Sequence, residues 1–206
     1  MADFARDAAW ASRGLAVVMP LAALDRRALA LLGPLALGWL VHRLRHYAAP
    51  SVLPNVVTAL RVALTSALAL FVREPHWQAA FVLAVFTIDG LDGWLARRLL
   101  ASSPQGAHFD MEADGFLVLV VCSLLFERVG AWVLLGGLLR YAFVLVTWVF
   151  PSRGEAPRSV LARYAFAASI AAYVAALLVS SWLPAALATL VLTASFGRSF
   201  FWSFRA

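Results

Sequence analysis

The sequence predicts an all-α integral membrane protein with six transmembrane helices, preceded by interfacial or re-entrant helices at the N-terminus. Of its 206 residues, 63% are hydrophobic and 14% are charged, and the mean hydropathy is +0.84. A soluble domain of this size carries about 25% charged residues. Apolar stretches of about 17–25 residues, the length that crosses a bilayer as a helix, recur along most of the chain. These observations exclude a water-soluble globule.

The first part of the chain differs from the rest. Two apolar pieces at 15–24 and 28–41 are separated by the charged triplet 25–27. Each piece is too short to cross a bilayer alone, and joining them would place three charges at mid-depth. An interfacial or re-entrant pair of helices fits this pattern better. We therefore divide the chain into an N-terminal segment, 1–50, and a six-helix transmembrane domain, 51–206.

Six apolar stretches follow this segment, and charged residues, prolines or serines separate them. The spans that this pattern predicts are 54–72, 77–99, 105–126, 130–150, 159–180 and 183–203. No internal repeat is visible, which counts against a transporter built from inverted repeats.

Every side chain that carries a positive charge at pH 7, with histidine neutral, is an arginine. All 17 Lys and Arg positions are arginine, so chemistry that needs a lysine, such as Schiff-base formation, is excluded. The pI of about 10.7 does not indicate nucleic-acid binding, because the arginines flank apolar spans and form no single basic face. The only cysteine, Cys122, rules out an intrachain disulfide.

The distribution of these arginines predicts the orientation in the membrane. The predicted topology puts the following on one side: Arg26, Arg27, Arg43, Arg45, Arg97, Arg98, Arg153, Arg158, Arg198 and Arg205. Only Arg73 and Arg128 fall on the other side. We expect the arginine-rich side to be cytoplasmic, in a protein of the bacterial inner membrane.

Five of the eleven acidic residues lie within positions 89–114, surrounded by apolar sequence. Asp89 and Asp92 share a helix face near the end of the second predicted span. Asp110 and Asp114 share a face near the start of the third. The two spans run antiparallel because a short turn joins them, so these faces can meet. Carboxylates are costly near hydrocarbon, and a cluster of them favours divalent cations with oxygen ligands. The sequence therefore predicts a site for one or two metal ions.

These aspartates belong to a longer pattern, Asp89-x2-Asp92-Gly93-x2-Ala96-Arg97-x8-Gly106-x3-Asp110-x3-Asp114. The pattern resembles the signature of the CDP-alcohol phosphotransferase family at every defined position. A second pattern, Pro54-Asn55-x2-Thr58-x2-Arg61, resembles the segment that precedes the signature in the phosphatidyltransferase branch of that family. The resemblance covers about residues 50–203.

The resemblance implies a reaction in which an alcohol hydroxyl attacks the phosphorus of a CDP-linked lipid and releases CMP. It implies two divalent cations, Mg²⁺ or Mn²⁺, held by Asp89, Asp92 and Asp110, with Asp114 as a ligand, the general base or both. It also implies a set of residues along the cytidine nucleotide. These are Asn55, Thr58, Arg61, Gly93, Ala96, Arg97 and Gly106.

The acceptor alcohol is expected near the remaining arginines. Arg140 lies in the middle of the fourth predicted span, where it either binds an acceptor phosphate or has a structural role, pairing with an acid or snorkelling. Arg153 and Arg158 lie near span ends, where they either receive a phosphate-bearing acceptor or anchor the protein to headgroups. Glu112 and His108 fall off the face of the aspartates, and for Glu112 we expect a solvent or interface position.

The leading hypothesis is transfer of a phosphatidyl group from CDP-diacylglycerol to a small polar alcohol, in phospholipid biosynthesis. Glycerol 3-phosphate is the first acceptor to consider. However, Met111 after Asp110 and Gly115 after Asp114 depart from the proline and lysine found there in many phosphatidylglycerophosphate synthases. The short chain and the second pattern, Pro54-Asn55-x2-Thr58-x2-Arg61, favour the phosphatidyltransferase branch of the family. Membrane lipids are expected partners, and homodimers are common in similar proteins.

Two other functions are open at this point. The second enzymatic hypothesis is the transfer of a CDP-linked head group to diacylglycerol. A hypothesis from a different functional class is that the protein is a cation transporter whose aspartates line an ion path. That path would need polar residues beyond the site, whereas 81–88 and 115–121 are apolar apart from Thr87.

Overall fold

The computed structural model describes residues 2–47, 53–98, 103–150, 160–179 and 181–205, with side-chain surroundings described for these except 2, 53–54 and 91–98. Within them the regular structure is helical and contains no strand, as predicted. The elements are α1 (Ala2–Ala22), α2 (Arg26–Arg43), η1 (Arg45–Tyr47), α3 (Leu53–Phe71), α4 (Pro75–Arg98), α5 (Pro104–Val129), η2 (Ala131–Val133), α6 (Leu134–Val149), α7 (Val160–Leu178) and α8 (Leu183–Phe204).

The last six α-helices coincide with the six predicted stretches to within a few residues. Three helical segments are long and apolar enough to cross a membrane in the part of the chain that the structure describes: Ala131–Val149, Val160–Leu178 and Leu183–Phe204. A further apolar helix, Asn55–Phe71, is shorter. The protein is therefore an integral membrane protein, and six spans remain a prediction.

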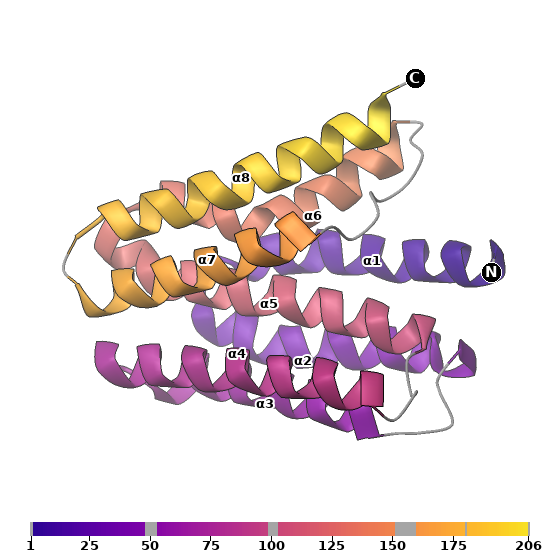
Figure 1. Ribbon diagram of the computed structural model, residues 1–206, viewed down its shortest axis with the longest axis horizontal. Coiled ribbons are helices and arrows are strands. Elements are labelled where there is room, and N and C mark those ends of the chain that lie inside the picture. The colour runs from indigo at the N-terminus through magenta and orange to yellow at the C-terminus, as the bar shows by residue number, and fades with distance from the viewer. Residues whose placement is uncertain (1, 48–52, 99–102, 151–159, 180, 206) are drawn as a thin grey trace.

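Helix α5 is the centre of the bundle (Figure 1). Its residues from Phe116 to Val121 are buried on every side, because α2, α3 and α6 all pack against it. A helix that is apolar all round is either covered by other parts of the protein or faces lipid, and neighbouring helices cover this stretch of α5. The aspartates near the start of α5 are thus carried on the most enclosed element of the fold.

The N-terminal segment forms two helices, as predicted, but α1 begins well before the first apolar piece at 15–24. α1 and α2 run antiparallel beside the bundle (Figure 1), where α1 packs on α6 and α2 packs on α3 and α5. α1 buries a face of small and apolar side chains at spacings of three and four: Ala8, Ala11, Leu15 and Met19. Hydropathy alone missed its first half, because charged residues on the exposed face lower the average.

The charged triplet 25–27 lies at the turn between these helices and not at mid-depth. Asp25 caps α2 by accepting a hydrogen bond from the backbone N–H of Arg27 at 2.8 Å. Gly33 lets α2 approach the central helix: a β-carbon there would stand 2.2 Å from Phe116 Cε2. The first helices are therefore packed into the fold, and short interfacial or re-entrant helices are not confirmed.

The helix directions also revise the arginine distribution. α2 begins at Arg26 and ends at Arg43, so these two arginines lie at opposite ends of the bundle (Figure 1). The prediction that Arg26 and Arg27 share a side with Arg43 and Arg45 is wrong. They lie instead at the end of the bundle that carries the α3–α4 turn. The end of the bundle where α3 begins still carries more arginines than the end with the α3–α4 turn, but the difference is smaller than expected.

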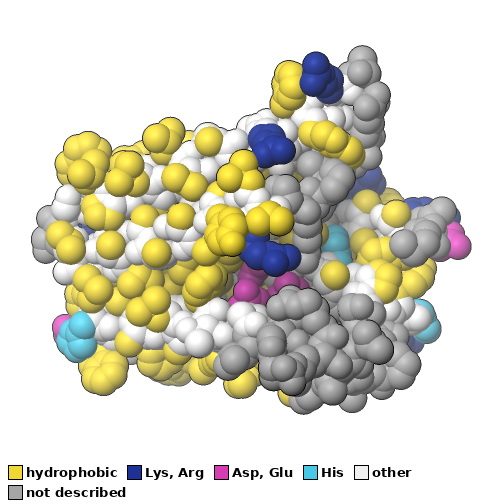
Figure 2. Space-filling view, in the orientation of Figure 1, with side chains coloured by type: hydrophobic (Ala, Val, Ile, Leu, Met, Phe, Trp, Pro, Cys, Tyr) yellow, Lys and Arg dark blue, Asp and Glu magenta, His cyan; other side chains and the backbone are white. Residues whose placement is uncertain are grey.

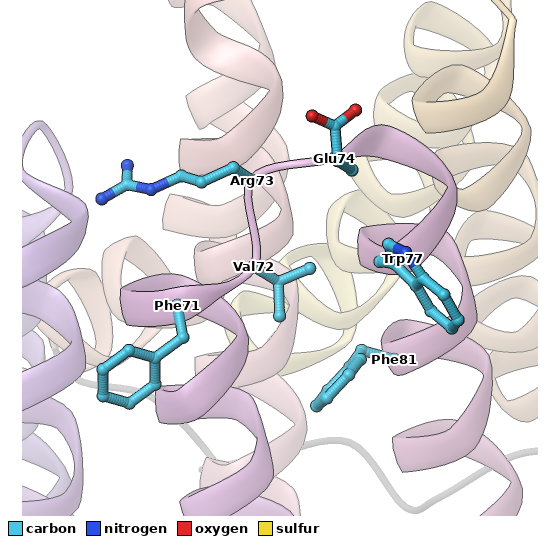
Figure 3. Close-up of a pocket in the computed structure, with 6 residues that line it drawn as sticks. All are labelled: Phe71, Val72, Arg73, Glu74, Trp77 and Phe81. Atoms are coloured by element: carbon cyan, nitrogen blue, oxygen red, sulfur yellow. The ribbon is translucent and has the colours of Figure 1, made fainter.

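A shallow pocket of about 320 Å³ lies at the α3–α4 turn, far from the aspartates along α4 (Figure 3). Its lining is Phe71, Val72, Arg73, Glu74, Trp77 and Phe81. Phe71 is 78% exposed and Trp77 is 58% exposed. Exposed aromatic rings at the end of a membrane helix are expected at the lipid–water interface, so the pocket needs no ligand to explain it.

Candidate metal and nucleotide site

The site lies at the end of the bundle where α3 and α5 begin and α4 ends (Figure 1). α5 starts sharply because the Ser103 hydroxyl accepts a hydrogen bond from the Gly106 N–H at 3.0 Å and Pro104 occupies the first turn. Asn55 of α3 donates to the Gln105 side chain at 2.9 Å. A β-carbon on Gly106 would stand 3.1 Å from both Asn55 Oδ1 and Ser103 Oγ. Glycine at this position therefore allows α3 to meet α5.

Arg61 of α3 joins three of the predicted aspartates. Its Nη1 lies 2.6 Å from Oδ1 of Asp89 and 2.6 Å from Oδ1 of Asp110, and its Nη2 lies 2.6 Å from Oδ1 of Asp114. The Arg61 side chain is 2% exposed, whereas the three aspartates are 25–31% exposed. The carboxylates thus surround a buried guanidinium and keep one side open. The faces of α4 and α5 meet as the spacing predicted.

The same carboxylates fit a metal ion. One oxygen from each of Asp89, Asp110 and Asp114 lies within 4.8 Å of the others. Carboxylate oxygens without sulfur or imidazole suit Mg²⁺, Mn²⁺ or Ca²⁺. Among these four side chains three carboxylates contact one guanidinium, so acidic groups outnumber basic ones, which suits a divalent cation.

The structure does not describe the side chains of several predicted site residues. The helix of α4 continues through Asp92, Gly93, Ala96 and Arg97, but their side-chain surroundings are not described. Arg153 and Arg158 lie outside the described residues altogether. Their roles stay predictions. Thr58, one turn before Arg61 on α3, is 2% exposed and faces the interior near the site.

The opposite face of α5 carries a buried polar network. Glu112 Oε1 accepts hydrogen bonds from Arg140 Nη2 on α6 and from Ser12 Oγ on α1, both at 2.6 Å. Ser12 Oγ also lies 2.8 Å from His108 Nε2. Glu112 is 1% exposed, so the expected solvent or interface position is wrong. Of the two alternatives for Arg140, the structure shows a pair with an acid, and acceptor binding stays a prediction.

The sequence offered one sign of this network. Arg140 is the single charge in the middle of the fourth predicted span, and a buried charge needs a partner, but nothing indicated that Glu112 would be that partner. Ser12 gave no sign, because a lone serine in a helix usually bonds its own backbone. Together these contacts tie the N-terminal hairpin to the back of the helix that carries Asp110 and Asp114.

Glu112→Ala should destabilise the protein by about 3–5 kcal/mol, because it removes the carboxylate that pairs with the buried Arg140 guanidinium. Unfolding of purified protein in detergent, followed by circular dichroism, measures this loss. Glu127→Ala, an exposed site on the same helix, should change stability by less than about 0.5 kcal/mol. Equal stability of the two variants would show that the pair is not buried as described.

A hollow on the surface leads to acidic side chains beside the start of α7, with basic side chains next to them (Figure 2). Phe86 of α4 and Phe166 of α7 contact each other with ring centroids 6.3 Å apart. The two helices run antiparallel (Figure 1). Asp89 and Arg163 each lie three residues from these rings, toward the site end. This offset places Arg163 at about the level of Asp89 on the neighbouring helix. The Arg163 side chain is exposed.

Comparison with known proteins places the chain in a family. The family model described as CDP-alcohol phosphatidyltransferase matches residues 51–195. The chain belongs to the CDP-alcohol phosphatidyltransferase family, and the resemblance inferred from its aspartates is confirmed. The matched region begins after the N-terminal hairpin.

A curated relative is similar over part of the chain. This chain is 40% identical over 83 residues to a CDP-diacylglycerol–glycerol-3-phosphate 3-phosphatidyltransferase of Pseudomonas fluorescens. The match covers 38% of this chain and 43% of the relative, so less than half of the relative's length is represented. No solved structure matches the chain.

Proposed function

We propose that the protein transfers a phosphatidyl group from CDP-diacylglycerol to a small polar alcohol and releases CMP. The observation that carries this proposal is the convergence of Asp89, Asp110 and Asp114 on one open site. The matching family supports the reaction class. The partial relative, named for glycerol 3-phosphate, supports that acceptor.

The chain's own residues supply a base and a set of anchors for this reaction. Asp114 lies one helical turn beyond Asp110 on α5, where it would take the proton from the attacking hydroxyl. The hydroxyl oxygen forms a bond to the phosphorus that bears the diacylglycerol, and the bond from that phosphorus to the CMP oxygen breaks. Asn55, Thr58 and the undescribed Arg97 would lie along the nucleotide.

Asp89, Asp92, Asp110 and Asp114 would hold two divalent cations, Mg²⁺ or Mn²⁺. Such ions supply positive charge to the attacking and leaving oxygens of an in-line displacement at phosphorus. The described carboxylates fit this use, because their oxygens lie within 4.8 Å of one another and their charge exceeds that of Arg61.

Arg163 is our candidate for holding a phosphate on the acceptor, alongside the earlier candidates Arg140, Arg153 and Arg158. It is exposed beside the site, and Arg140 already has a carboxylate partner. Arg163→Ala should raise KM for glycerol 3-phosphate by about tenfold, the loss expected for one charge-assisted contact. KM for CDP-diacylglycerol should stay within about twofold. Initial-rate kinetics with each substrate varied in turn measure both constants. An unchanged acceptor KM would remove Arg163 from the acceptor site.

Purified protein incubated with labelled CDP-diacylglycerol, Mn²⁺ and a panel of alcohols tests the proposal. We expect CMP release together with one new phosphatidyl lipid, identified by mass spectrometry. If CDP-diacylglycerol yields no CMP with any alcohol, while a CDP-linked head group and diacylglycerol do, the second enzymatic reading replaces the first. Divalent-ion flux into liposomes without CMP formation would favour the cation transporter.

For the membrane topology we propose six spans formed by α3 to α8, with the site at the cytoplasmic face of the bacterial inner membrane. The end of the bundle that carries the site also carries Arg43, Arg45, Arg163 and Arg198, and such an excess is expected on the cytoplasmic side. We also propose the domain division 1–50 and 51–206, and a homodimer.

A further inference from the structure

Arg61, which the family resemblance implies lies beside the nucleotide, occupies the centre of the carboxylate cluster. One nitrogen, Nη1, contacts oxygens of both Asp89 and Asp110, and the other, Nη2, contacts Asp114. These are the three residues whose oxygens are close enough to share an ion. The guanidinium therefore contacts the same carboxylates that would bind a divalent cation.

The surroundings hold this guanidinium in place. The Arg61 side chain is 2% exposed, so it cannot leave for solvent without opening the packing between α3 and α5. Thr65, one turn further along α3, is also buried, and its hydroxyl donates to the Arg61 backbone carbonyl at 2.8 Å. Within these four side chains, three carboxylates contact one guanidinium.

Electrostatics then gives Arg61 two opposite effects. It stabilises three neighbouring carboxylates that would otherwise repel one another. It also repels any divalent cation that the same carboxylates bind. At a separation of about 5 Å, even the dielectric constant of water leaves a repulsion that weakens binding by roughly tenfold.

We propose that Arg61 is a positioning residue that serves as the counter-ion of the metal-free site and lowers its affinity for divalent cations. The inference rests on the proposed function, because it takes the carboxylates to be metal ligands. In this role Arg61 keeps the carboxylates facing one another until cations arrive, and it limits how tightly they are held.

The test is Mn²⁺ binding to detergent-purified full-length protein, measured from the free Mn²⁺ signal in electron paramagnetic resonance without substrate. Arg61→Met, which keeps the length but removes the charge, should bind Mn²⁺ about tenfold tighter than the wild type. Arg61→Gln should also bind more tightly. Arg61→Lys, which keeps the charge, should stay within about threefold. Arg128→Met, at the other end of the bundle, should match the wild type.

Thermal unfolding supplies a second readout. In EDTA, Arg61→Met should melt below the wild type, and saturating Mn²⁺ should remove most of that difference. Equal or weaker Mn²⁺ binding by both neutral variants would overturn the inference and make Arg61 a purely structural partner. Failure of both to fold even in Mn²⁺ would overturn it as well, because the metal would then not replace the arginine. A wild type that binds no Mn²⁺ would instead contradict the proposed metal site.

Discussion

Replacing Asp110 with asparagine should reduce turnover by about 10³-fold or more. Asparagine keeps the size of the side chain but removes the charge at the junction of α4 and α5. A metal ion at a reacting phosphoryl group contributes several kcal/mol of transition-state stabilisation, and each 1.36 kcal/mol is a factor of ten in rate. CMP release from CDP-diacylglycerol at saturating Mn²⁺ measures the loss. Asp89→Asn should behave in the same way, because both carboxylates contact the same Arg61 nitrogen.

Two controls separate the loss of a ligand from the loss of the fold. Glu127→Gln removes an exposed charge from the far end of the same helix and should leave turnover unchanged. Asp110→Asn should retain the helical circular-dichroism spectrum of the wild type and bind Mn²⁺ more weakly. Wild-type turnover in folded Asp110→Asn would show that this carboxylate takes no part in the reaction.

Asp114→Asn should lower kcat by about 10²–10⁴-fold while leaving KM for CDP-diacylglycerol within about threefold. This range is the usual contribution of a general base. The residue lies one turn beyond Asp110, and its Oδ1 contacts Arg61 Nη2 at 2.6 Å. Because asparagine still accepts that hydrogen bond, the site geometry should be kept. Steady-state kinetics with CDP-diacylglycerol varied at saturating acceptor separate the two constants.

The outcome for Asp114 also distinguishes its two assigned roles. A pure base would lose kcat with Mn²⁺ affinity unchanged, whereas a pure ligand would lose Mn²⁺ affinity in parallel with kcat. Turnover equal to that of the wild type would remove Asp114 from both roles.

The aspartate site was predictable because it is encoded in local spacing. Residues three or four apart share a helix face, and a short turn forces two neighbouring helices to be antiparallel. These two facts bring Asp89 of α4 to Asp110 and Asp114 of α5. The family pattern added the expected chemistry, and it matches the same residues.

The role of Arg61 was less predictable from the sequence. The family resemblance implied that Arg61 lies beside the nucleotide, but nothing local showed that α3 would carry it into the middle of the carboxylates. That placement depends on packing between α3 and α5, which includes the close approach of Asn55 to Gly106. Tertiary packing of this kind leaves no periodic signal.

The full length of α1 in the N-terminal hairpin was missed for a related reason. Hydropathy averages the exposed charges of α1 with its buried small residues, so the helix was cut to its apolar second half. Its buried face packs through Ala8, Ala11 and Ser12, and Ser12 reaches Glu112 on α5. Small residues contribute to such packing through close approach more than through hydrophobicity.

The most direct test of the central claim is a metal add-back experiment with the wild-type protein. Protein treated with EDTA is mixed with CDP-diacylglycerol and glycerol 3-phosphate, and CMP and lipid products are measured before and after Mn²⁺ is added. We predict no turnover in EDTA, and equal amounts of CMP and a phosphatidylated product once Mn²⁺ is present. Turnover that is the same in EDTA as in Mn²⁺ would contradict a carboxylate-bound metal site as the centre of this protein's function.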